Sequence, residues 1–272
     1  MNYLEFDFEI TDTQHAETLI ALLSDQNFEG FEETEKNLKA FIKEADFNDA
    51  IFKETLLLFP SIKYTTAVIE NINWNQQWED NFEPVLVDDF VAVRAHFHQS
   101  IKTVQHEIII TPKMSFGTGH HATTHLMMQL MRAVDFKNKT VFDFGTGTGV
   151  LAILAEILGA VNIRAIDIDE WSIINTQENI IKNNCNQITV EQMDRIPSGN
   201  QYDIILANIN LNVITETATE IACISKPGAI VLFSGVLKTD EKAMTETLLR
   251  AGFSKIEIVQ RGDWIAIACL KE

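Results

Sequence analysis

The sequence predicts two unlike parts, a small α+β domain followed by a larger α/β domain with a doubly wound parallel sheet. Three observations support this prediction. From residue 93 onward, apolar strands and helical segments alternate, which is typical of a parallel sheet with helices on both faces. Residues 141–159 contain an apolar strand, a glycine-rich turn and a helix in immediate succession. Residues 1–92 contain 20 acidic and 5 basic residues, whereas residues 93–272 contain 19 and 16, so the two parts differ in composition.

The first 70 residues predict four strands and two helices. The stretch "YLEFDFEI" alternates apolar and polar residues, as a half-buried strand does. The stretch "TQHAETLIALLSDQ" places its large apolar residues mostly on one helical face. A hairpin, a second helix that ends at Pro60 and a last strand are expected to follow, in "FEGFEET" with "NLKAFIKE", "DAIFKETLLLF" and "IKYTTAVIE". This βαββαβ order is that of a small ferredoxin-like domain over residues 1–70.

Residues 71–92 are predicted to connect the two domains. Trp74, Trp78 and Phe82 recur at four-residue spacing, so they share one face of a short helix that ends before Pro84. Aromatic residues at helical spacing more often form packing surfaces than binding sites. We therefore expect this face to pack between the two domains, and contact with a substrate is the alternative.

Residues 93–272 predict the doubly wound domain. Its expected strands are "TVFDFG", "NIRAIDID", "ITVEQM", "YDIILANI" and "GAIVLFSG", with a helix after each of the first two. Two further strand-like runs, "SKIEIVQR" and "WIAIACL", close the chain as a hairpin and imply one antiparallel strand. Ligands bind at the carboxyl ends of the strands in such sheets. The residues that follow each strand are therefore candidates for a site.

The composition excludes several classes of protein. No apolar run is long enough to span a membrane, and the N-terminus lacks the pattern of a secretion signal. The three cysteines (Cys185, Cys223 and Cys269) form no CxxC pair, which indicates neither a disulfide framework nor a zinc site and fits a cytoplasmic protein. The net charge of −18 argues against direct nucleic-acid binding, which needs clustered Lys and Arg. The acidic first part is better suited to a basic protein partner, and acidity that only aids solubility is the alternative.

The turn "DFGTGTGV" indicates a ligand site. Gly145, Gly147 and Gly149 allow the backbone to pass close to a ligand, and the N–H groups at the start of the next helix face it. Asp167 lies 22 residues beyond Gly145, where its carboxylate can accept both hydrogen bonds from a ribose diol. Nicotinamide dinucleotides and S-adenosylmethionine are both bound in this way. The dinucleotide fingerprint has a glycine three residues after its second glycine, but Val150 occupies that position here, so the spacing favours S-adenosylmethionine.

The residues Phe-Gly-Thr-Gly also occur earlier in the chain, in "TPKMSFGTGHHATTHLMMQLM". This copy follows the strand "HEIIIT" and leads into an amphipathic helix, which Thr123 or Thr124 is expected to cap. No strand–helix–strand crossover follows, so it is not a second nucleotide fingerprint. His120, His121 and His125 could suggest a metal site, but carboxylate or cysteine partners at ligand spacing are missing, and no metal is expected.

Four motifs together resemble those of the PrmA family of ribosomal-protein methyltransferases: F-G-T-G-x-H-x-T-T, D-F-G-x-G-x-G, I-D-I-D and A-N-I. The resemblance covers residues 71–272, including the connector pattern W...W...F.P. It implies the class I methyltransferase fold, a doubly wound sheet that ends in an antiparallel hairpin. It also implies transfer of methyl groups from S-adenosylmethionine, with S-adenosylhomocysteine as product. The implied acceptors are lysine ε-amines and the N-terminal α-amine of ribosomal protein L11 of the large subunit.

The resemblance further implies that six residues contact the cofactor: Phe116, Thr124, Gly145, Gly147, Asp167 and Asn208. Thr124 and Phe116 correspond to the methionine end of the cofactor, Gly145 to the adenosyl group, and Asp167 to the ribose. Asn208 corresponds to a position beside the methyl group and is the candidate catalytic residue.

The sequence around Asn208 favours an aliphatic amine as the methyl acceptor. Methyltransferases that act on adenine often carry an Asn-Pro-Pro-Tyr-like sequence here, whereas this chain has Asn-Ile-Asn-Leu and lacks the aromatic residue that stacks a flipped base. We expect the Asn208 side-chain oxygen to orient the amine without a dedicated general base. Residues 1–70 would then form the substrate-recognition domain. The alternatives are a methyltransferase of similar fold that acts on another protein, RNA or DNA, and a non-catalytic protein that binds S-adenosylmethionine.

Overall fold

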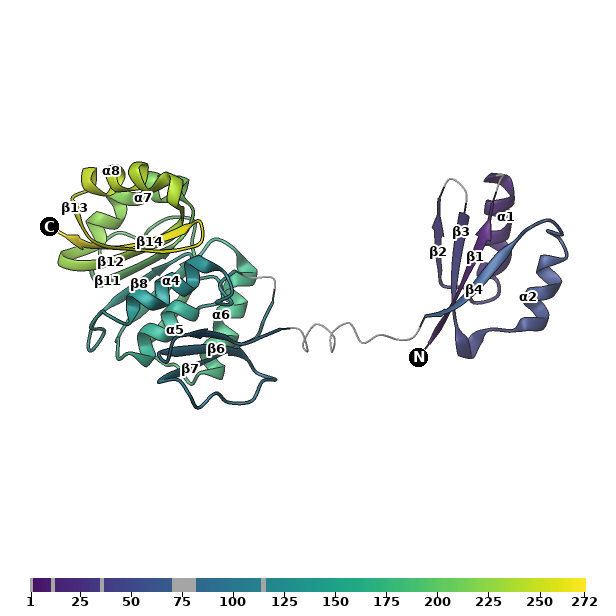
Figure 1. The fold of residues 1–272 in the computed structure, drawn as a ribbon, viewed down its shortest axis with the longest axis horizontal. Helices are drawn as coiled ribbons and strands as arrows, with labels where there is room; N and C mark the ends of the chain where they lie inside the picture. Colours follow the sequence, from purple (N-terminus) through teal and green to yellow (C-terminus); the bar gives the residue numbers. More distant parts are fainter. Residues whose placement is uncertain (1, 11–12, 35–36, 70–81, 114–115) are drawn as a thin grey trace. The chain divides into compact units, whose positions relative to one another are not determined.

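The computed structural model describes residues 2–10, 13–34, 37–69, 82–113 and 116–272. The chain divides into two compact units, Met1–Asn81 and Phe82–Glu272 (Figure 1). The second unit begins before residue 93, the predicted start of the larger domain, because residues 82–92 already contribute strands to it. The connector helix predicted around Trp74 and Trp78 lies outside the described residues.

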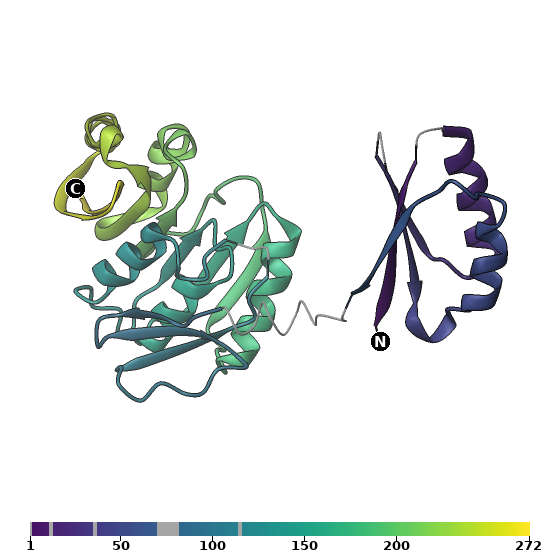
Figure 2. The same ribbon diagram turned by 45° about the vertical axis from the view of Figure 1, so that its right-hand side comes forward.

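The first unit contains the predicted order of four strands and two helices. The elements are β1 (Tyr3–Glu9), α1 (Thr13–Ser24), β2 (Gly30–Glu33), β3 (Asn37–Lys43), a short 3₁₀ turn (Glu44–Asp46), α2 (Asp49–Leu56) and β4 (Tyr64–Ile69). The antiparallel sheet has the order β2-β3-β1-β4, and both helices cover one of its faces (Figure 2). The alternating apolar residues of β1 and β3 face these helices and form the core. Helix α2 begins where the Asn48 side chain accepts bonds from the backbone N–H groups of Ala50 and Ile51, and it ends before Pro60.

The second unit is built on a seven-stranded sheet with the order β10-β9-β8-β11-β12-β14-β13. All seven predicted strands are present: β8 (Val141–Phe144), β9 (Ile163–Asp167), β10 (Ile188–Gln192), β11 (Tyr202–Asn208), β12 (Ser225–Leu237), β13 (Phe253–Arg261) and β14 (Trp264–Lys271). Strand β14 is antiparallel to both of its neighbours, while the pairs from β10 to β12 are parallel. The predicted terminal hairpin with one antiparallel strand is therefore confirmed.

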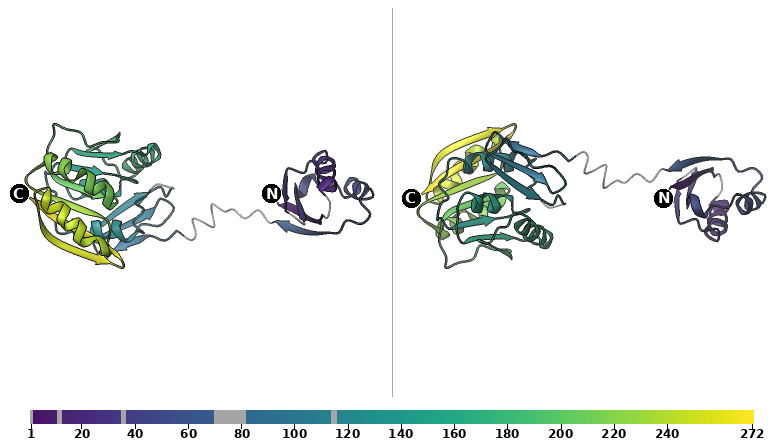
Figure 3. Two further views of the ribbon diagram at one scale, coloured as in Figure 1. Left: turned by 90° about the horizontal axis from the view of Figure 1, so that it is seen from above. Right: turned by 90° about the horizontal axis from the view of Figure 1, so that it is seen from below.

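Helices cover both faces of this sheet (Figure 3). They are α4 (Ala122–Met131), α5 (Val150–Ile157) and α6 (Glu170–Lys182) on one face, and α7 (Leu211–Ile224) and α8 (Glu241–Arg250) on the other. Each face has its own apolar core because successive residues of the central strands point to opposite sides. Ile204 and Leu206 belong to one core, while Ile205 and Ala207 belong to the other.

A second, three-stranded sheet of this unit packs on the side of α5. It contains β5 (Val85–Val87), β6 (Val91–Ala95) and β7 (His106–Ile110) in that order. Only the last of these strands was predicted from the sequence, because residues 71–92 were expected to form the connector. The missed signal is a pair of valine-rich runs separated by a turn at Asp88, which has a positive φ of 49°.

None of the helices in the described ranges is long and apolar enough to cross a membrane.

Candidate active site

Three parallel strands of the large sheet end beside one another, at or directly before residues that the sequence marked as candidates. Strand β8 ends at Phe144, β9 ends at Asp167 and β11 ends at Asn208, and the sheet order places β8 between the other two. The glycine turn follows β8 directly, and helix α5 begins after Gly149. The carboxyl edge of the sheet thus brings together the Asp167 carboxylate, the Asn208 amide and the glycine turn, as expected for a ligand site.

The three glycines of the turn are required by close packing inside the protein. All three have positive φ, at 73° for Gly145, 58° for Gly147 and 79° for Gly149. A Cβ atom at Gly145 would lie 2.6 Å from Ile209 Cγ2, and one at Gly149 would lie 2.7 Å from Thr176 Cγ2. At Gly147 it would overlap the carbonyl oxygen of Phe116. The glycines were predicted to allow the approach of a ligand, but their neighbours in the fold already exclude a side chain.

The two Phe-Gly-Thr-Gly stretches lie side by side. The backbone N–H of Thr148 donates to the carbonyl oxygen of Phe116 at 2.9 Å. The Thr148 hydroxyl donates to the carbonyl oxygen of Gly117 at 2.7 Å. Thr148, which sequence analysis did not single out, therefore joins the first stretch to the second. Its only signal in the sequence is its place inside the repeated Gly-Thr pattern.

Two buried side chains of helix α6 donate hydrogen bonds to backbone carbonyl groups of the glycine turn. The Thr176 hydroxyl donates to the carbonyl oxygen of Gly147, and the Asn179 amide donates to that of Thr148, both at 2.8 Å. Thr176 and Asn179 have no exposed surface. Unpaired carbonyl groups at this depth would be costly, so α6 stabilises the conformation of the turn.

Asp167 is held against the turn while keeping acceptor capacity. Its Oδ2 accepts a bond from the backbone N–H of Gly147 at 2.8 Å, and its Oδ1 accepts one from that of Asp169 at 3.0 Å. A carboxylate oxygen can accept more than one hydrogen bond, so both oxygens remain able to bind a further donor. A pocket of about 290 Å³ lies beside it, and Ile168 and Met193 are among its lining residues.

Asn208 and Thr124 are brought into contact across 84 residues of sequence. The Asn208 Nδ2 donates to the Thr124 hydroxyl at 3.2 Å. Thr124 is fully buried, and the Asn208 Oδ1 is buried without a hydrogen-bond partner among the described residues. The Asn208 Oδ1 is one of seven buried side-chain atoms without a partner among the described residues, and its place at the end of β11 on the carboxyl edge suits contact with a ligand.

The start of helix α4 differs from its prediction. His121, not Thr123 or Thr124, caps the helix: its Nδ1 accepts from the backbone N–H of Thr123 at 3.3 Å. The hydroxyl of Thr124 is therefore not used as a cap, and it contacts Asn208 instead. An imidazole nitrogen can accept as a hydroxyl oxygen does, but cap statistics favour Ser, Thr, Asp and Asn, so the sequence pointed to the wrong residue.

The residues around Phe116 form an aromatic row. The Phe116 ring is 52% exposed, and its centroid lies 5.2 Å from that of His121. The His121 centroid lies 4.6 Å from that of Trp264, at the start of β14. His120 points elsewhere and is within hydrogen-bond distance of the Thr118 hydroxyl and the carbonyl oxygen of Glu83. The neighbouring histidines therefore have separate partners.

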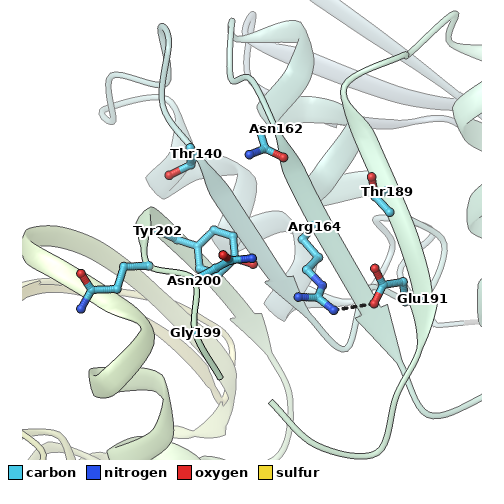
Figure 4. A pocket seen from close by; sticks show the side chains of 9 residues that line it. Thr140, Asn162, Arg164, Thr189, Glu191, Gly199, Asn200 and Tyr202 are labelled. Carbon is cyan, nitrogen blue, oxygen red and sulfur yellow. Dashed lines mark hydrogen bonds and ion pairs between the residues drawn. The ribbon is translucent and has the colours of Figure 1, made fainter. Parts of the chain in front are cut away.

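A separate polar pocket of about 430 Å³ lies at the opposite edge of the sheet (Figure 4). Its lining includes Thr140, directly before β8, and Tyr202, the first residue of β11. It also includes the Arg164 guanidinium, which pairs with Glu191 at 2.5 Å. The amino ends of parallel strands are not where such sheets bind ligands. The candidate site is therefore the one at the carboxyl edge.

Comparison with known proteins identifies the family. Residues 6–272 match the model of the family described as ribosomal protein L11 methyltransferase (PrmA). The chain belongs to this family. A family member from Phocaeicola vulgatus is 34% identical over an alignment of 276 residues that covers 98% of this chain and 98% of that one. One from Porphyromonas gingivalis is 37% identical over an alignment of 281 residues that covers 98% of this chain and 97% of that one.

The family is also represented among solved structures. A ribosomal protein L11 methylase from Lactobacillus delbrueckii subsp. bulgaricus matches with a TM-score of 0.65 at 26% sequence identity, over 70% of this chain and 100% of that one. The resemblance drawn from four motifs is thus confirmed over nearly the whole chain, including residues before the connector. The expected class I methyltransferase fold is confirmed as well.

Proposed function

We propose that this protein transfers methyl groups from S-adenosylmethionine to amines of ribosomal protein L11. The observation that carries the proposal is the buried, unpartnered Oδ1 of Asn208, which lies at the carboxyl end of β11 in a member of the L11 methyltransferase family. The acceptor amines are the ε-amines of lysines and the N-terminal α-amine. The four motifs shared with the family support this choice.

The residues of the site fit S-adenosylmethionine. The Asp167 carboxylate has free acceptor capacity for the two ribose hydroxyls, and the pocket beside it offers room for the adenine against Met193 and Ile168. The turn at Gly145 and Gly147 places the start of α5 at the same edge, while the turn's own N–H groups donate to Ile166, Asp167 and Phe116. Phe116 and Thr124 would hold the methionine end. When bound, S-adenosylmethionine supplies a methyl group on a sulfonium centre, so the protein need not provide a covalent nucleophile.

The acceptor amine must be neutral and correctly oriented before it can react. A lysine amine has a pKa of about 10.4 in water, so its charged form dominates near pH 7. Transfer into a site shielded from water lowers this pKa, because burial disfavours the charged form. The Asn208 Oδ1 can then accept a hydrogen bond from the amine and direct its lone pair.

Thr124 positions Asn208 for this task. Because its hydroxyl holds the Nδ2 group, the Oδ1 of the same amide is left as the free end. No carboxylate or imidazole is needed as a general base in this scheme, since the amine that reacts is already neutral. The residual proton on the methylated product can pass to water.

The first unit is proposed to recognise the protein substrate. Residues 1–81 contain 17 acidic and 5 basic residues, so their field attracts a basic protein and repels nucleic-acid phosphates. Methylation of several amines on one substrate requires that the substrate be presented in more than one way. A recognition unit separate from the catalytic one would permit this.

The proposal is tested by incubating the full-length protein with labelled S-adenosylmethionine and purified L11, followed by mass mapping of the labelled product. We expect label on lysine ε-amines and the N-terminus of L11. The variant Asn208→Ala should bind the cofactor but lose most of its turnover, whereas Asn186→Ala, an exposed asparagine before β10, should behave like the wild type. Cofactor binding without label on any ribosomal protein would instead indicate a non-catalytic binding protein. Label on ribosomal RNA alone would replace L11 as the substrate.

A further inference from the structure

Strand β4 forms an open edge of the four-stranded sheet in the first unit. Within the described residues it pairs only with β1. All six of its residues, Tyr-Thr-Thr-Ala-Val-Ile, are exposed, with Val68 at 56% and Tyr64 at 40%. None of the six is charged, and none is proline or glycine.

The opposite edge of the same sheet, strand β2, differs in length, exposure and charge. Strand β2 has four residues, and it carries Glu32 and Glu33. Short edges with charged side chains are the usual protection against pairing with another chain, whereas a long, uncharged, β-branched edge is a template for it. The sheet is therefore protected along β2 and open along β4.

Acidic side chains lie next to β4 on the face that the helices do not cover. Asp7 is the register partner of Thr65, and Glu5 is the partner of Ala67, so these side chains share one face with small neighbours on β4. A pocket of about 670 Å³ is lined by Asp7, Glu9 and Thr65, among others. Lys39 pairs with Glu5 at 3.0 Å and is the register partner of Asp7, whose Oδ1 accepts a bond from Asn37 Nδ2 at 2.7 Å. Lys63 also lines the pocket, but no salt bridge between described residues occupies Asp7 or Glu9.

We propose that the β4 edge binds an extended, basic segment of a protein partner as a fifth strand of the sheet. The identity of the partner as L11 rests on the proposed function. Backbone hydrogen bonds along β4 supply the affinity, as in other cases of strand addition. Val68 and Tyr64 supply apolar contact on the side of the helices.

The acidic side chains of Asp7 and Glu9 explain why the added segment is basic. Neighbouring strands lie about 4.8 Å apart, so the added strand is two such steps from β1. A lysine or arginine placed opposite Thr65 can extend its stem across that small side chain to the Asp7 carboxylate and the pocket beyond it. The excess of acidic residues in the whole unit strengthens this preference.

The experiment measures binding of purified L11 to full-length protein without cofactor, and the KM and kcat for its methylation. Val68→Lys places a charge on the open edge, and Leu57→Lys is the matched control, since Leu57 is 78% exposed in the same unit but lies after α2. We expect Val68→Lys to weaken L11 binding and raise KM roughly tenfold with kcat unchanged, and Leu57→Lys to change neither. Asp7→Asn should weaken binding roughly threefold, and Glu17→Gln on α1 should not.

Hydrogen exchange provides the direct readout of strand addition. On L11 binding, the amides of β4 should become protected while those of β2 do not change. The inference would be overturned if the Val68→Lys variant bound and methylated L11 as the wild type does, or if β4 gained no protection. Either result would leave the proposed function unaffected. Failure of the wild type to bind or methylate L11 would overturn both. A wild-type dimer that Val68→Lys converts to a monomer would assign the edge to a second copy of this chain.

Discussion

The side chain of Asn208, at the end of β11, donates a hydrogen bond of 3.2 Å to the hydroxyl of Thr124 in the first turn of α4. This bond orients the amide so that its Oδ1 is left buried and unpartnered at the carboxyl edge of the sheet. The proposed catalytic residue thus depends on a helical residue that lies 84 positions earlier in the chain.

Removal of the Thr124 hydroxyl should impair turnover more than cofactor binding. In Thr124→Val the Nδ2 of Asn208 loses its acceptor and the amide can rotate. Misplacement of a catalytic group by about 1 Å can cost roughly a hundredfold in rate, and we expect a loss of about tenfold to a hundredfold. Thr124→Ser keeps the hydroxyl and should retain most of the rate. Single-turnover rates and cofactor dissociation constants measure the two effects, and equal rates for the valine and serine variants would contradict the positioning role.

Replacement of Asp167 should weaken cofactor binding. Asp167→Asn removes the charge that accepts bonds from the backbone of Gly147 and, in the proposal, from the ribose. A hydrogen bond to a charged group contributes about 1.5–3 kcal/mol, so the dissociation constant of S-adenosylmethionine should rise by at least roughly tenfold. The control is Glu170→Gln, an exposed residue in the first turn of α6 with the same change of charge. Unchanged affinity in calorimetric titration of Asp167→Asn would remove Asp167 from the site.

Alanine at Gly147 should be far more harmful than alanine at Gly199. Both glycines have positive φ, at 58° and 102°, so both variants carry a backbone penalty of roughly 1–2 kcal/mol. Only Gly147→Ala adds a clash, with the carbonyl oxygen of Phe116, because a Cβ at Gly199 meets nothing within 4 Å. We expect Gly147→Ala to separate the two Phe-Gly-Thr-Gly stretches and lower both stability and cofactor affinity. Urea unfolding gives the free energy of unfolding of both variants and of the wild type, and the difference between the two variants measures the clash. Equal losses of free energy in the two variants would show that packing at Gly147 is unimportant.

The free energy of unfolding should depend on pH through Asp143. Burial, with a contribution from the charge of Asp167, raises the pKa of the Asp143 carboxyl to about 7, against the opposing bond from the Thr146 hydroxyl. An unfolded chain releases this proton near pH 4. Between about pH 4 and 7 the native state therefore binds more protons, and its stability falls as the pH rises, by at most about 1.4 kcal/mol per pH unit. Asp143→Asn should remove this slope in urea unfolding between pH 4.5 and 7.5, and parallel profiles for the two proteins would refute it.

Asp203 provides the opposite case as a control. Burial alone would raise the pKa of Asp203, but bonds from Lys226 and Thr140 together outweigh it and lower the pKa to about 2. This stabilisation is present above about pH 4 and is lost as the pH falls toward 2. Asp203→Asn should therefore reduce stability by a constant amount between pH 4.5 and 7.5.

Sequence alone determined the strands of the first unit and of the seven-stranded sheet, the terminal hairpin and the family. These features depend on local information, because apolar periodicity, glycine turns and short motifs are each contained in a few consecutive residues. The pair β5 and β6 was missed, since a connector was expected where two short valine-rich runs meet at Asp88. The motifs also pointed to Asp167 and Asn208 at the ends of strands.

Only the tertiary structure decided how these residues meet. His121 caps α4 and leaves the Thr124 hydroxyl for Asn208, and Thr148 joins two glycine stretches that look like copies of each other. The open edge at β4 likewise depends on which strands pair, and not on the composition of β4. The physical reason is the same in each case. A hydrogen bond between distant segments depends on the order of the strands and the packing of the helices, which no local pattern of residues records.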